Sequence, residues 1–297
     1  MKVAFVVPCR DKVGTLDKCI WSVFNQTYSP MQIVLSDQGS VDGTREMLDE
    51  LAADYKGPNT VTVLDCPHTY AVGMHGMNVH LNWIHDQIDA DIVLCMSADD
   101  FALPERTERV IAAFKEHDPD MVMNAMYTVD PDGKVLGVNA HPKESGFVTP
   151  RECLEGQVGG STGHAWKMSF FRDVGGFDLL PGYDSYFPFL ACVRGKGYYL
   201  HEKLTVYVTH ADPNNTGTEG IMRAAKTTAE FAKINESSYF QLSTAFLAAV
   251  KRLDDWKINT EDARQPLYES VLTNCMGWTQ AREFLTLNHI DPIPLRA

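Results

Sequence analysis

The sequence predicts an α/β fold: a mostly parallel, doubly wound sheet flanked by helices and followed by a helical C-terminal extension. In the first 118 residues, short and continuously apolar runs rich in β-branched residues indicate strands buried on both faces, as in parallel sheets. These runs alternate with segments whose apolar residues recur at helical spacing, which is typical of βαβ units. From residue 218 onward the pattern is mostly helical, which predicts the extension.

Four strands and four helices are expected, in order, along this first part of the chain. Pro8 closes the first strand, and Thr15 is a plausible N-cap of the first helix. Pro104 suits the first turn of the fourth helix, where its missing N–H costs nothing. The expected strands are residues 3–7, 33–35, 61–64 and 92–96, and the expected helices are residues 16–24, 44–55, 77–87 and a segment from 104 through 114.

The pattern changes near residue 120. Residues 121–129 and 134–138 flank Asp130-Pro131-Asp132-Gly133, a strong turn signal, and together they predict a hairpin. Residues 157–163 are rich in glycine and are expected to form a loop, and residues 204–208 predict another apolar strand.

The composition is that of a soluble globular protein, with 297 residues, 44% apolar and 22% charged. A net charge of −13 argues against a broad face for nucleic acid or for an anionic membrane. No apolar run reaches the roughly 18 residues that a bilayer crossing needs, and the apolar N-terminus is too short for a signal peptide. The seven cysteines show no C-x-x-C spacing. We therefore expect a cytoplasmic protein without a transmembrane segment, with its cysteines reduced.

Two adjacent carboxylates, Asp99 and Asp100, follow the fourth expected strand directly. In open α/β sheets, ligands collect beyond the carboxyl ends of the strands. Neighbouring carboxylates repel each other unless a cation or a proton sits between them, and a hard divalent cation with oxygen ligands commonly accompanies phosphates. The alternative is a helix N-terminus enriched in Asp, which the helix dipole favours.

The strand end and turn from Leu35 to Thr44 pack two Asp, two Gly and three hydroxyl side chains into the gap between a strand and a helix. Glycine permits close approach of the backbone to a ligand, and a carboxylate can accept a hydrogen bond from a base or a ribose. A tight turn capped by Asp42 or Thr44 is the alternative, although it leaves Asp37 without a role.

Six motifs, taken together, resemble the family 2 glycosyltransferases, which have the GT-A fold. Their order and spacing carry the resemblance, which covers roughly residues 1–212. Ser97-Ala98-Asp99-Asp100 stands where that family carries its D-x-D metal motif. The other motifs are Val6-Val7-Pro8, Gln26-Thr27-Tyr28, the turn from Asp37 to Thr44, Val174-Gly175-Gly176-Phe177-Asp178 and Gly182-Tyr183-Asp184.

The resemblance implies a domain organisation and a set of site residues. Residues 1–212 would form the GT-A domain, with a nucleotide-sugar-binding half (1–118) and an acceptor half (119–212), and residues 213–297 would form the extension. Asp184 would be the general base. The donor contacts would be Pro8, Arg10, Asp37, Gln38 and Asp99, and the ligands of a Mn²⁺ or Mg²⁺ ion would be Asp99, Asp100 and His210.

Three positions depart from the family pattern. Gln38 stands where a second Asp is frequent, so base recognition can differ. Ser97 replaces the first acid of the D-x-D motif, which leaves fewer carboxylates for the metal. Tyr183 replaces the Glu before Asp184, and the single remaining carboxylate suffices for one proton abstraction.

The acceptor site is the least determined part of the prediction. Trp166, at the end of a glycine-rich loop, is a candidate stacking platform for a sugar ring, beside His164 and Tyr183. The equally weighted alternative is a flexible loop that ends in a core Trp. His75, His80 and His85 recur every five positions, which does not align them on one helix face, so they are expected to be structural or to touch the acceptor rather than to form a metal cluster.

These residues predict a metal-dependent, inverting glycosyltransferase that moves a sugar, by default from a uridine diphosphate sugar, to an acceptor hydroxyl. The acceptor could be a glycan, a lipid-linked sugar, a protein or a modified base, and the C-terminal helices could mediate self-association. One alternative is a nucleotidyltransferase, for which only Arg10 and Lys12 stand in place of a basic triphosphate loop. The other is a non-catalytic protein that binds nucleotide sugars, which Ser97 and Tyr183 favour.

Overall fold

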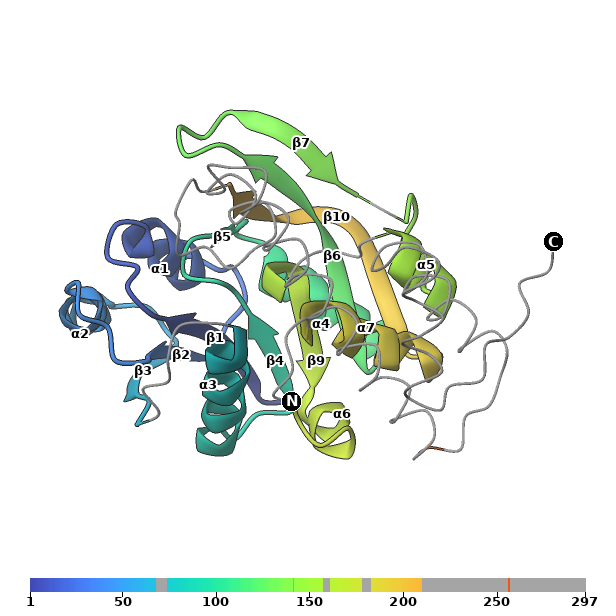
Figure 1. The fold of residues 1–297 in the computed structure, drawn as a ribbon, viewed down its shortest axis with the longest axis horizontal. Helices are drawn as coiled ribbons and strands as arrows, with labels where there is room; N and C mark the ends of the chain where they lie inside the picture. Colours follow the sequence, from blue (N-terminus) through green and yellow to red (C-terminus); the bar gives the residue numbers. More distant parts are fainter. Residues whose placement is uncertain (68–73, 141, 157–160, 178–182, 210–255, 257–297) are drawn as a thin grey trace, which may run out of the picture.

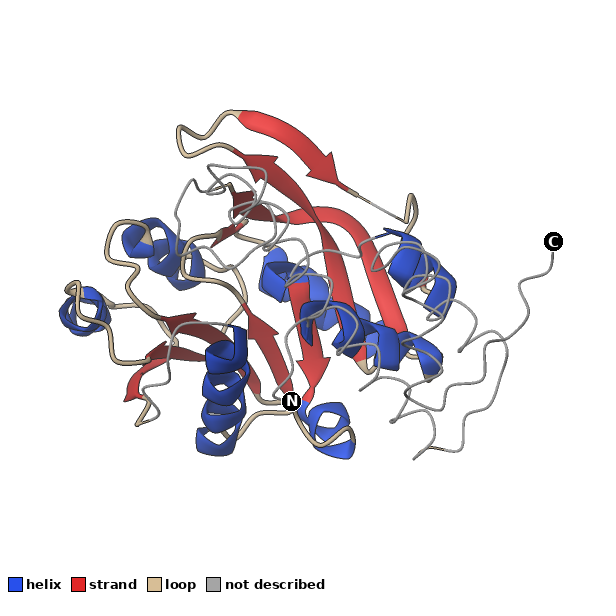
Figure 2. Cartoon of the chain, viewed as in Figure 1, coloured by secondary structure: helices blue, strands red, loops and turns tan. Residues whose placement is uncertain are grey.

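The computed structural model describes residues 1–67, 74–140, 142–156, 161–177, 183–209 and 256; for residues 74–76, 154–156, 161 and 183–186 it describes the backbone only. Ten strands form one mixed sheet with helices on both faces (Figures 1 and 2). The strands are β1 (Val3–Cys9), β2 (Gln32–Asp37), β3 (Thr60–Asp65), β4 (Ile92–Cys95), β5 (Phe101–Ala102), β6 (Met121–Val129), β7 (Val135–Asn139), β8 (Gly146–Phe147), β9 (His164–Lys167) and β10 (Gly197–Val208). The helices are α1 (Leu16–Phe24), α2 (Thr44–Asp54), α3 (Met74–Gln87), α4 (Arg106–His117), α5 (Pro150–Gly156), α6 (Met168–Asp173) and α7 (Tyr183–Val193), with a 3₁₀ turn η1 (Ser161–Gly163).

The first four strands form the parallel half of the sheet, in the order β3-β2-β1-β4. The register pairs Cys9 of β1 with Asp37 of β2, and Val6 of β1 with Cys95 of β4. The carboxyl ends of β1, β2 and β4 therefore lie side by side. Because the strand order reverses between β1 and β4, this edge is a topological switch point, where α/β sheets bind ligands.

The second half of the sheet is mixed. Strand β9 lies between β4 and β6 and runs antiparallel to both, with Ile92 opposite Lys167 and Met121 opposite Trp166. Strands β6 and β10 are parallel, and β6 and β7 form the predicted hairpin. The segment that contains His164 and Trp166 is thus a central strand.

The sheet separates two apolar cores. Along β1, Phe5 and Val7 face the core formed with α1, α2 and α4, whereas Ala4 and Val6 face the core formed with α3, α6 and α7. Both sets are fully buried, which explains why this strand is continuously apolar in sequence. The predicted α/β arrangement with helices on both faces is confirmed.

Strand β10 begins well before the predicted segment 204–208. Its register with β6 shifts between Leu200 and Lys203 and again between Lys203 and Thr205. These irregularities, together with the polar run from His201 to Lys203, break the apolar pattern that marks a strand in the sequence. The predicted extension, residues 213–297, lies outside the described residues except for Trp256.

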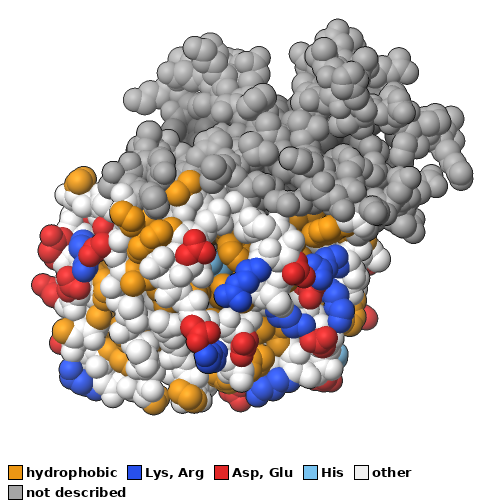
Figure 3. Space-filling model, turned by 90° about the horizontal axis from the view of Figure 1, so that it is seen from below, with side chains coloured by type: hydrophobic (Ala, Val, Ile, Leu, Met, Phe, Trp, Pro, Cys, Tyr) orange, Lys and Arg blue, Asp and Glu red, His pale blue; other side chains and the backbone are white. Residues whose placement is uncertain are grey.

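Figure 3 shows the molecule from below in the view of Figure 1. Acidic and basic side chains are interspersed over the described part of this face. Ion pairs in the structure include Lys196 with Asp118 (3.3 Å) and Arg194 with Asp120 (3.1 Å). Among the described residues, no helix has both the length and the apolar character that a membrane span requires.

Candidate active site

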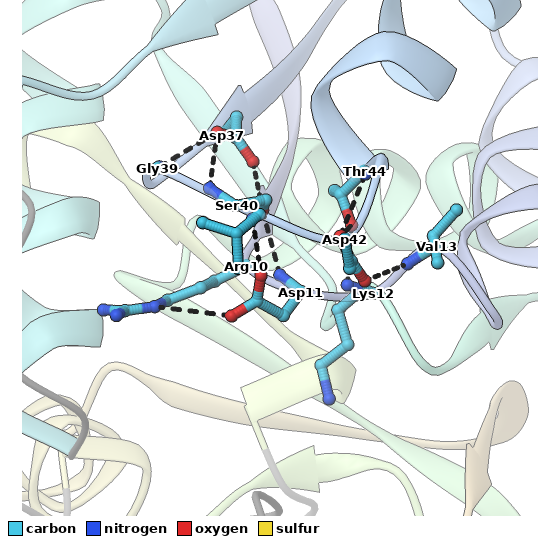
Figure 4. A network of polar contacts seen from close by, with 10 residues as sticks. Arg10, Asp11, Lys12, Val13, Asp37, Gly39, Ser40, Asp42 and Thr44 are labelled. Carbon is cyan, nitrogen blue, oxygen red and sulfur yellow. Dashed lines mark hydrogen bonds and ion pairs between the residues drawn. The ribbon is translucent and has the colours of Figure 1, made fainter.

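Two loops at the switch point, one after β1 and one after β2, are held together by hydrogen bonds (Figure 4). The Asp11 N–H donates to Ser40 Oγ (2.9 Å), and the Val41 N–H donates back to Asp11 Oδ1 (2.8 Å). The Lys12 N–H donates to Thr44 Oγ1 (2.7 Å). The two loops therefore form one unit rather than two independent turns.

Asp42 links this unit to helix α2. Its carboxylate accepts hydrogen bonds from the N–H groups of Val13 (3.1 Å) and Thr44 (2.9 Å) and from the Thr44 hydroxyl (2.6 Å). Burial disfavours the charge of Asp42, but these hydrogen bonds outweigh burial and hold the pKa of the carboxyl below its ordinary value. The N-cap residue of α2 is Gly43, and the Asp42 side chain instead holds Thr44, the first residue of the helix.

Asp37 organises the turn that begins with it. The Asp37 carboxylate is buried and accepts the N–H groups of Gly39 (2.9 Å) and Ser40 (3.0 Å), as well as the Ser40 hydroxyl. Gly39 has a φ of +72°, a conformation that side-chain-bearing residues rarely adopt. Gln38 is buried, and its N–H donates to the Cys9 carbonyl (3.0 Å). The turn therefore has a defined shape, and contact of Asp37 or Gln38 with a base stays a prediction.

The two adjacent carboxylates after β4 have different surroundings. Asp100 is 2% exposed and accepts the Val208 N–H (2.9 Å) at Oδ1, with a further hydrogen bond to the Thr162 side chain. Burial, followed by the charge of Asp99, raises the pKa of Asp100 well above its ordinary value. The Asp99 side chain is 15% exposed, and its Oδ2 lies 2.9 Å from Lys12 Nζ. Asp100 thus connects the ends of β4 and β10, and Asp99 is the more accessible of the pair.

A buried guanidinium lies behind this acidic pair. Arg106, the first residue of α4, is fully buried and donates to the carbonyls of Cys95 (3.0 Å) and His164 (3.2 Å). Its guanidinium carbon lies 5.2 Å from the centre of the Phe5 ring. Burial lowers the pKa of Arg106 to about 10, so it is a cation at neutral pH close to the carboxyl edge. Nothing in its charged sequence context, Pro-Glu-Arg-Thr-Glu-Arg, predicts this burial.

Comparison with known proteins identifies the family. Residues 4–172, more than half of the chain, match the family described as glycosyl transferase family 2. The chain belongs to glycosyl transferase family 2. The predicted family and the prediction of a glycosyltransferase are confirmed.

A sequence relative and two solved structures agree with this family assignment. An uncharacterized glycosyltransferase of Nostoc sp. is 24% identical over 136 residues, which are 46% of this chain and 40% of the relative, so the matched part spans less than half of that protein. TarS 1–349 of S. aureus, solved with UDP-GlcNAc, has a TM-score of 0.57 at 14% identity and covers 92% of this chain and 82% of its own. Another TarS structure has a TM-score of 0.58 at 16% identity over 98% of this chain and 54% of its own. At such identities the structural similarity concerns the fold, and it agrees with the predicted GT-A class.

The predicted donor residues Pro8 and Arg10 lie at the switch point, and their contact with a nucleotide stays a prediction. Pro8 is buried in β1, and Arg10 follows the strand, with its Nε 4.0 Å from the Asp11 carboxylate. Figure 4 shows the side chains of Arg10 and Lys12 extending away from the hydrogen-bonded loops. These two cations therefore flank the edge where the carboxylates stand.

Two of the predicted acceptor residues are wrong. Trp166 is 1% exposed, and its Nε1–H donates to His85 Nε2 (3.1 Å). His164 is 2% exposed. Both belong to strand β9, which lies between β4 and β6 in the sheet, and both side chains are buried, so neither offers a surface to a sugar. The alternative of a Trp in the core is correct, but Trp166 lies within a strand and not at the end of a loop.

The remaining predicted residues are only partly described. Tyr183 and Asp184 are the first two residues of α7, and the described part of the structure gives their backbone alone. His210 lies outside the described residues. Among the residues that the structure does describe, no group of three or more His, Cys, Asp or Glu side chains could hold a metal. Of the three predicted metal ligands, the described part of the structure therefore contains two, Asp99 and Asp100.

The two buried histidines are structural, as expected. His80 Nε2 lies 2.7 Å from Ser36 Oγ, and His85 Nδ1 lies 2.6 Å from the Leu81 carbonyl. Because His85 Nε2 accepts from Trp166, its Nδ1 carries the proton. Burial lowers the pKa of both histidines to about 4, so both are neutral at physiological pH.

Proposed function

We propose that this chain transfers a sugar from a nucleoside diphosphate sugar to an acceptor hydroxyl, in a metal-dependent reaction that inverts the anomeric carbon. One observation carries the proposal: the accessible carboxylate of Asp99 stands at the switch point, beside the rigid unit formed by the loops after β1 and β2. TarS was solved with UDP-GlcNAc and with UDP, so a uridine nucleotide is the first donor to test.

The residues at the switch point fit a divalent cation shared with a diphosphate. Mg²⁺ and similar ions are commonly held by one or two carboxylates together with phosphate oxygens and water. Asp99 is accessible for this role, and the raised pKa of Asp100 is the expected state of a buried carboxyl beside a second carboxylate when no cation is present. His210 is the third predicted ligand. When bound, the cation would offset the negative charge that the leaving diphosphate gains.

The chain's own residues would hold the donor and receive the acceptor's proton. The turn organised by Asp37 and Ser40 would shape the nucleotide pocket, because its backbone is fixed before any ligand arrives. Asp184, at the start of α7, would take the proton of the attacking hydroxyl as that oxygen bonds to the anomeric carbon. A single displacement of this kind inverts the configuration at that carbon.

Binding of UDP in the presence of Mn²⁺, measured by calorimetry, tests the donor site. We expect the isosteric variant Asp99→Asn to weaken UDP binding in Mn²⁺ at least tenfold and to lower turnover about 100-fold, in the range of a lost electrostatic contact to a developing charge. Asp132→Asn, in the exposed β6–β7 turn, is the matched control and should behave as wild type. Equal UDP binding by Asp99→Asn and wild type would overturn the donor site proposed here.

Asp184→Asn tests the base separately. This variant should bind UDP and Mn²⁺ normally but lose about 10²–10⁴-fold in turnover, the usual contribution of a positioned general base. Near-normal turnover at unchanged folding stability would exclude Asp184 as the base.

Analysis of the released nucleotide separates the alternatives. A glycosyltransferase releases a nucleoside diphosphate, a nucleotidyltransferase releases pyrophosphate, and a non-catalytic binding protein releases neither. The anomeric configuration of the product, read by NMR, tests inversion.

The cytoplasmic location, the domain boundary at residue 212 and self-association through residues 213–297 stay predictions of the sequence.

A further inference from the structure

Lys12 and Asp99 form an ion pair at the candidate active site. Lys12 Nζ lies 2.9 Å from Asp99 Oδ2, and the two side chains are only 23% and 15% exposed. Partial burial protects such a pair from screening by salt. Asp99, which belongs to the predicted metal motif, is therefore paired with a cation that the chain itself supplies.

Both members of the pair are fixed at their backbones. The Lys12 N–H donates to Thr44 Oγ1 (2.7 Å), and the Lys12 carbonyl accepts the N–H groups of Thr15 and Leu16 (3.0 Å each). The Thr15 hydroxyl also donates to the carbonyl of Ala98 (3.1 Å), the residue before Asp99. The loop after β1 and the acidic segment after β4 are thus linked next to the ion pair.

The side chain of Lys12 can move although its backbone is fixed. A lysine carries a compact point charge on a flexible four-carbon stem, and lysine is a common binder of phosphate. In Figure 4 the Lys12 side chain points away from the hydrogen-bonded loops. Its ammonium group can therefore exchange one nearby anion for another without disturbing the loops.

We propose that Lys12 is a cation of the donor site that exchanges partners: it neutralises Asp99 in the free protein and contacts the donor diphosphate once a divalent cation occupies Asp99. This inference rests on the proposed function and deepens it. Lys12 then competes with the metal for Asp99 before the donor binds, and it assists the metal afterwards.

Exchange of partners predicts effects of opposite sign from one substitution. In Lys12→Met, Mn²⁺ alone should bind several-fold more tightly, because a competing cation is gone. UDP in the presence of saturating Mn²⁺ should bind at least fivefold more weakly, because a phosphate contact is gone. A lysine that only stabilises the fold would shift both affinities in the same direction or neither.

The experiment uses the full chain and measures the binding of Mn²⁺ alone and of UDP at saturating Mn²⁺, each by calorimetry. Lys18→Met, which removes an exposed lysine of α1, controls for the loss of one positive charge. Lys12→Arg keeps the charge and should retain UDP binding at saturating Mn²⁺, so it keeps the test valid if Lys12→Met folds poorly. Melting curves of each variant report folding.

The outcomes separate this inference from the proposed function. Tighter Mn²⁺ binding together with weaker UDP binding in Lys12→Met supports the exchange. Wild-type affinities in Lys12→Met, or both affinities weakened together, overturn the role of Lys12 and leave the donor site standing. If wild type itself binds neither Mn²⁺ nor UDP, the proposed function and this inference both fail.

Discussion

The two halves of the sheet position their functional segments by different means. In the parallel half, polar loops after β1 and β2 hold each other by hydrogen bonds among residues 11–44. In the mixed half, an aromatic cluster packs between β9 and the helices α3, α6 and α7. We define this cluster as His85, Trp166, Phe171, Phe177 and Phe187; their ring centroids lie 4.1 Å apart for His85–Phe171 and 4.7 Å apart for Phe177–Phe187.

This difference separates ligand binding from stability. The polar loops bury little apolar area, so a change there should alter nucleotide binding more than folding. The aromatic cluster belongs to one of the two cores, so a change there should alter folding first. The following predictions test this contrast, and a donor-loop substitution that unfolds the chain would break it.

The largest effect is expected for Trp166→Ala. Removing a fully buried Trp leaves a cavity and an unpaired His85 nitrogen, and it should lower the free energy of unfolding by about 3–5 kcal/mol. Denaturant titration followed by circular dichroism measures the change. Trp21→Ala, which removes a ring that is 40% exposed, is the control and should cost far less. A small loss in Trp166→Ala would mean that the aromatic cluster does not support the fold.

Acid should weaken the packing around helix α3 next. His80 and His85 have folded-state pKa values of about 4, below the unfolded value of about 6.5. Between these values the unfolded chain binds more protons, so stability falls as the pH drops from about 6.5 towards 4. Each histidine contributes at most about 1.4 kcal/mol per pH unit in this window.

Denaturant midpoints at several pH values between 7.5 and 4.5 measure this loss. The variant His85→Phe should be less stable at neutral pH, since it loses two hydrogen bonds, but it should show a shallower decline in acid. The same slope in both proteins would exclude His85 as a source of the acid sensitivity.

The sequence predicts the polar loops of the parallel half better than the aromatic cluster of the mixed half. The loops are built from residues that are close together in the sequence, whereas the cluster is built from residues that are far apart in it. The turn from Asp37 to Thr44 is one continuous segment, so its glycines, hydroxyls and carboxylates indicate a turn and a polar site directly from the sequence. Strand β9 exists only because β4 and β6 pair with it, and four residues containing His and Lys carry no strand signal of their own. The acceptor roles of His164 and Trp166 were therefore mispredicted.

The burial and pairing of charged residues are hard to predict from the sequence for a related reason. Arg106 lies in a charged stretch that looks like a solvated helix start, and only the tertiary contacts with Cys95, His164 and Phe5 make it part of the interior. Lys12 is recognisable in the sequence as a basic residue near a strand end. Its pairing with Asp99 requires the parallel register of β1 and β4, which no single motif specifies.

An intermediate effect is expected for Asn82→Ala, which tests how the mixed half holds the Gly-Gly-Phe segment of the family. The Asn82 amide donates to the Phe177 carbonyl (2.7 Å) and accepts the Phe177 N–H (2.9 Å), and Gly176 beside it has a φ of +80°. Loss of these two hydrogen bonds to the Phe177 backbone should cost about 1–3 kcal/mol of unfolding free energy.

Asn25→Ala, at an exposed position after α1, is the matched control for Asn82→Ala. UDP binding should be unchanged in both variants, because the hydrogen bonds of the Asn82 side chain go to Phe177 and not to the donor loops. If Asn82→Ala weakened UDP binding as strongly as it weakened folding, the separation between the halves would be wrong.

The smallest effect on folding is expected for Ser40→Ala, within the donor loops. Its hydroxyl joins the two loops by accepting the Asp11 N–H (2.9 Å) and donating to Asp37. The site is near solvent, so water can replace these contacts and the free energy of unfolding should fall by only about 1 kcal/mol. UDP affinity should nevertheless fall several-fold, because the donor would then bind a turn that is no longer fixed in advance. Calorimetry at a temperature where both proteins are folded measures this change, and unchanged UDP affinity would show that the joined loops do not prepare the donor site.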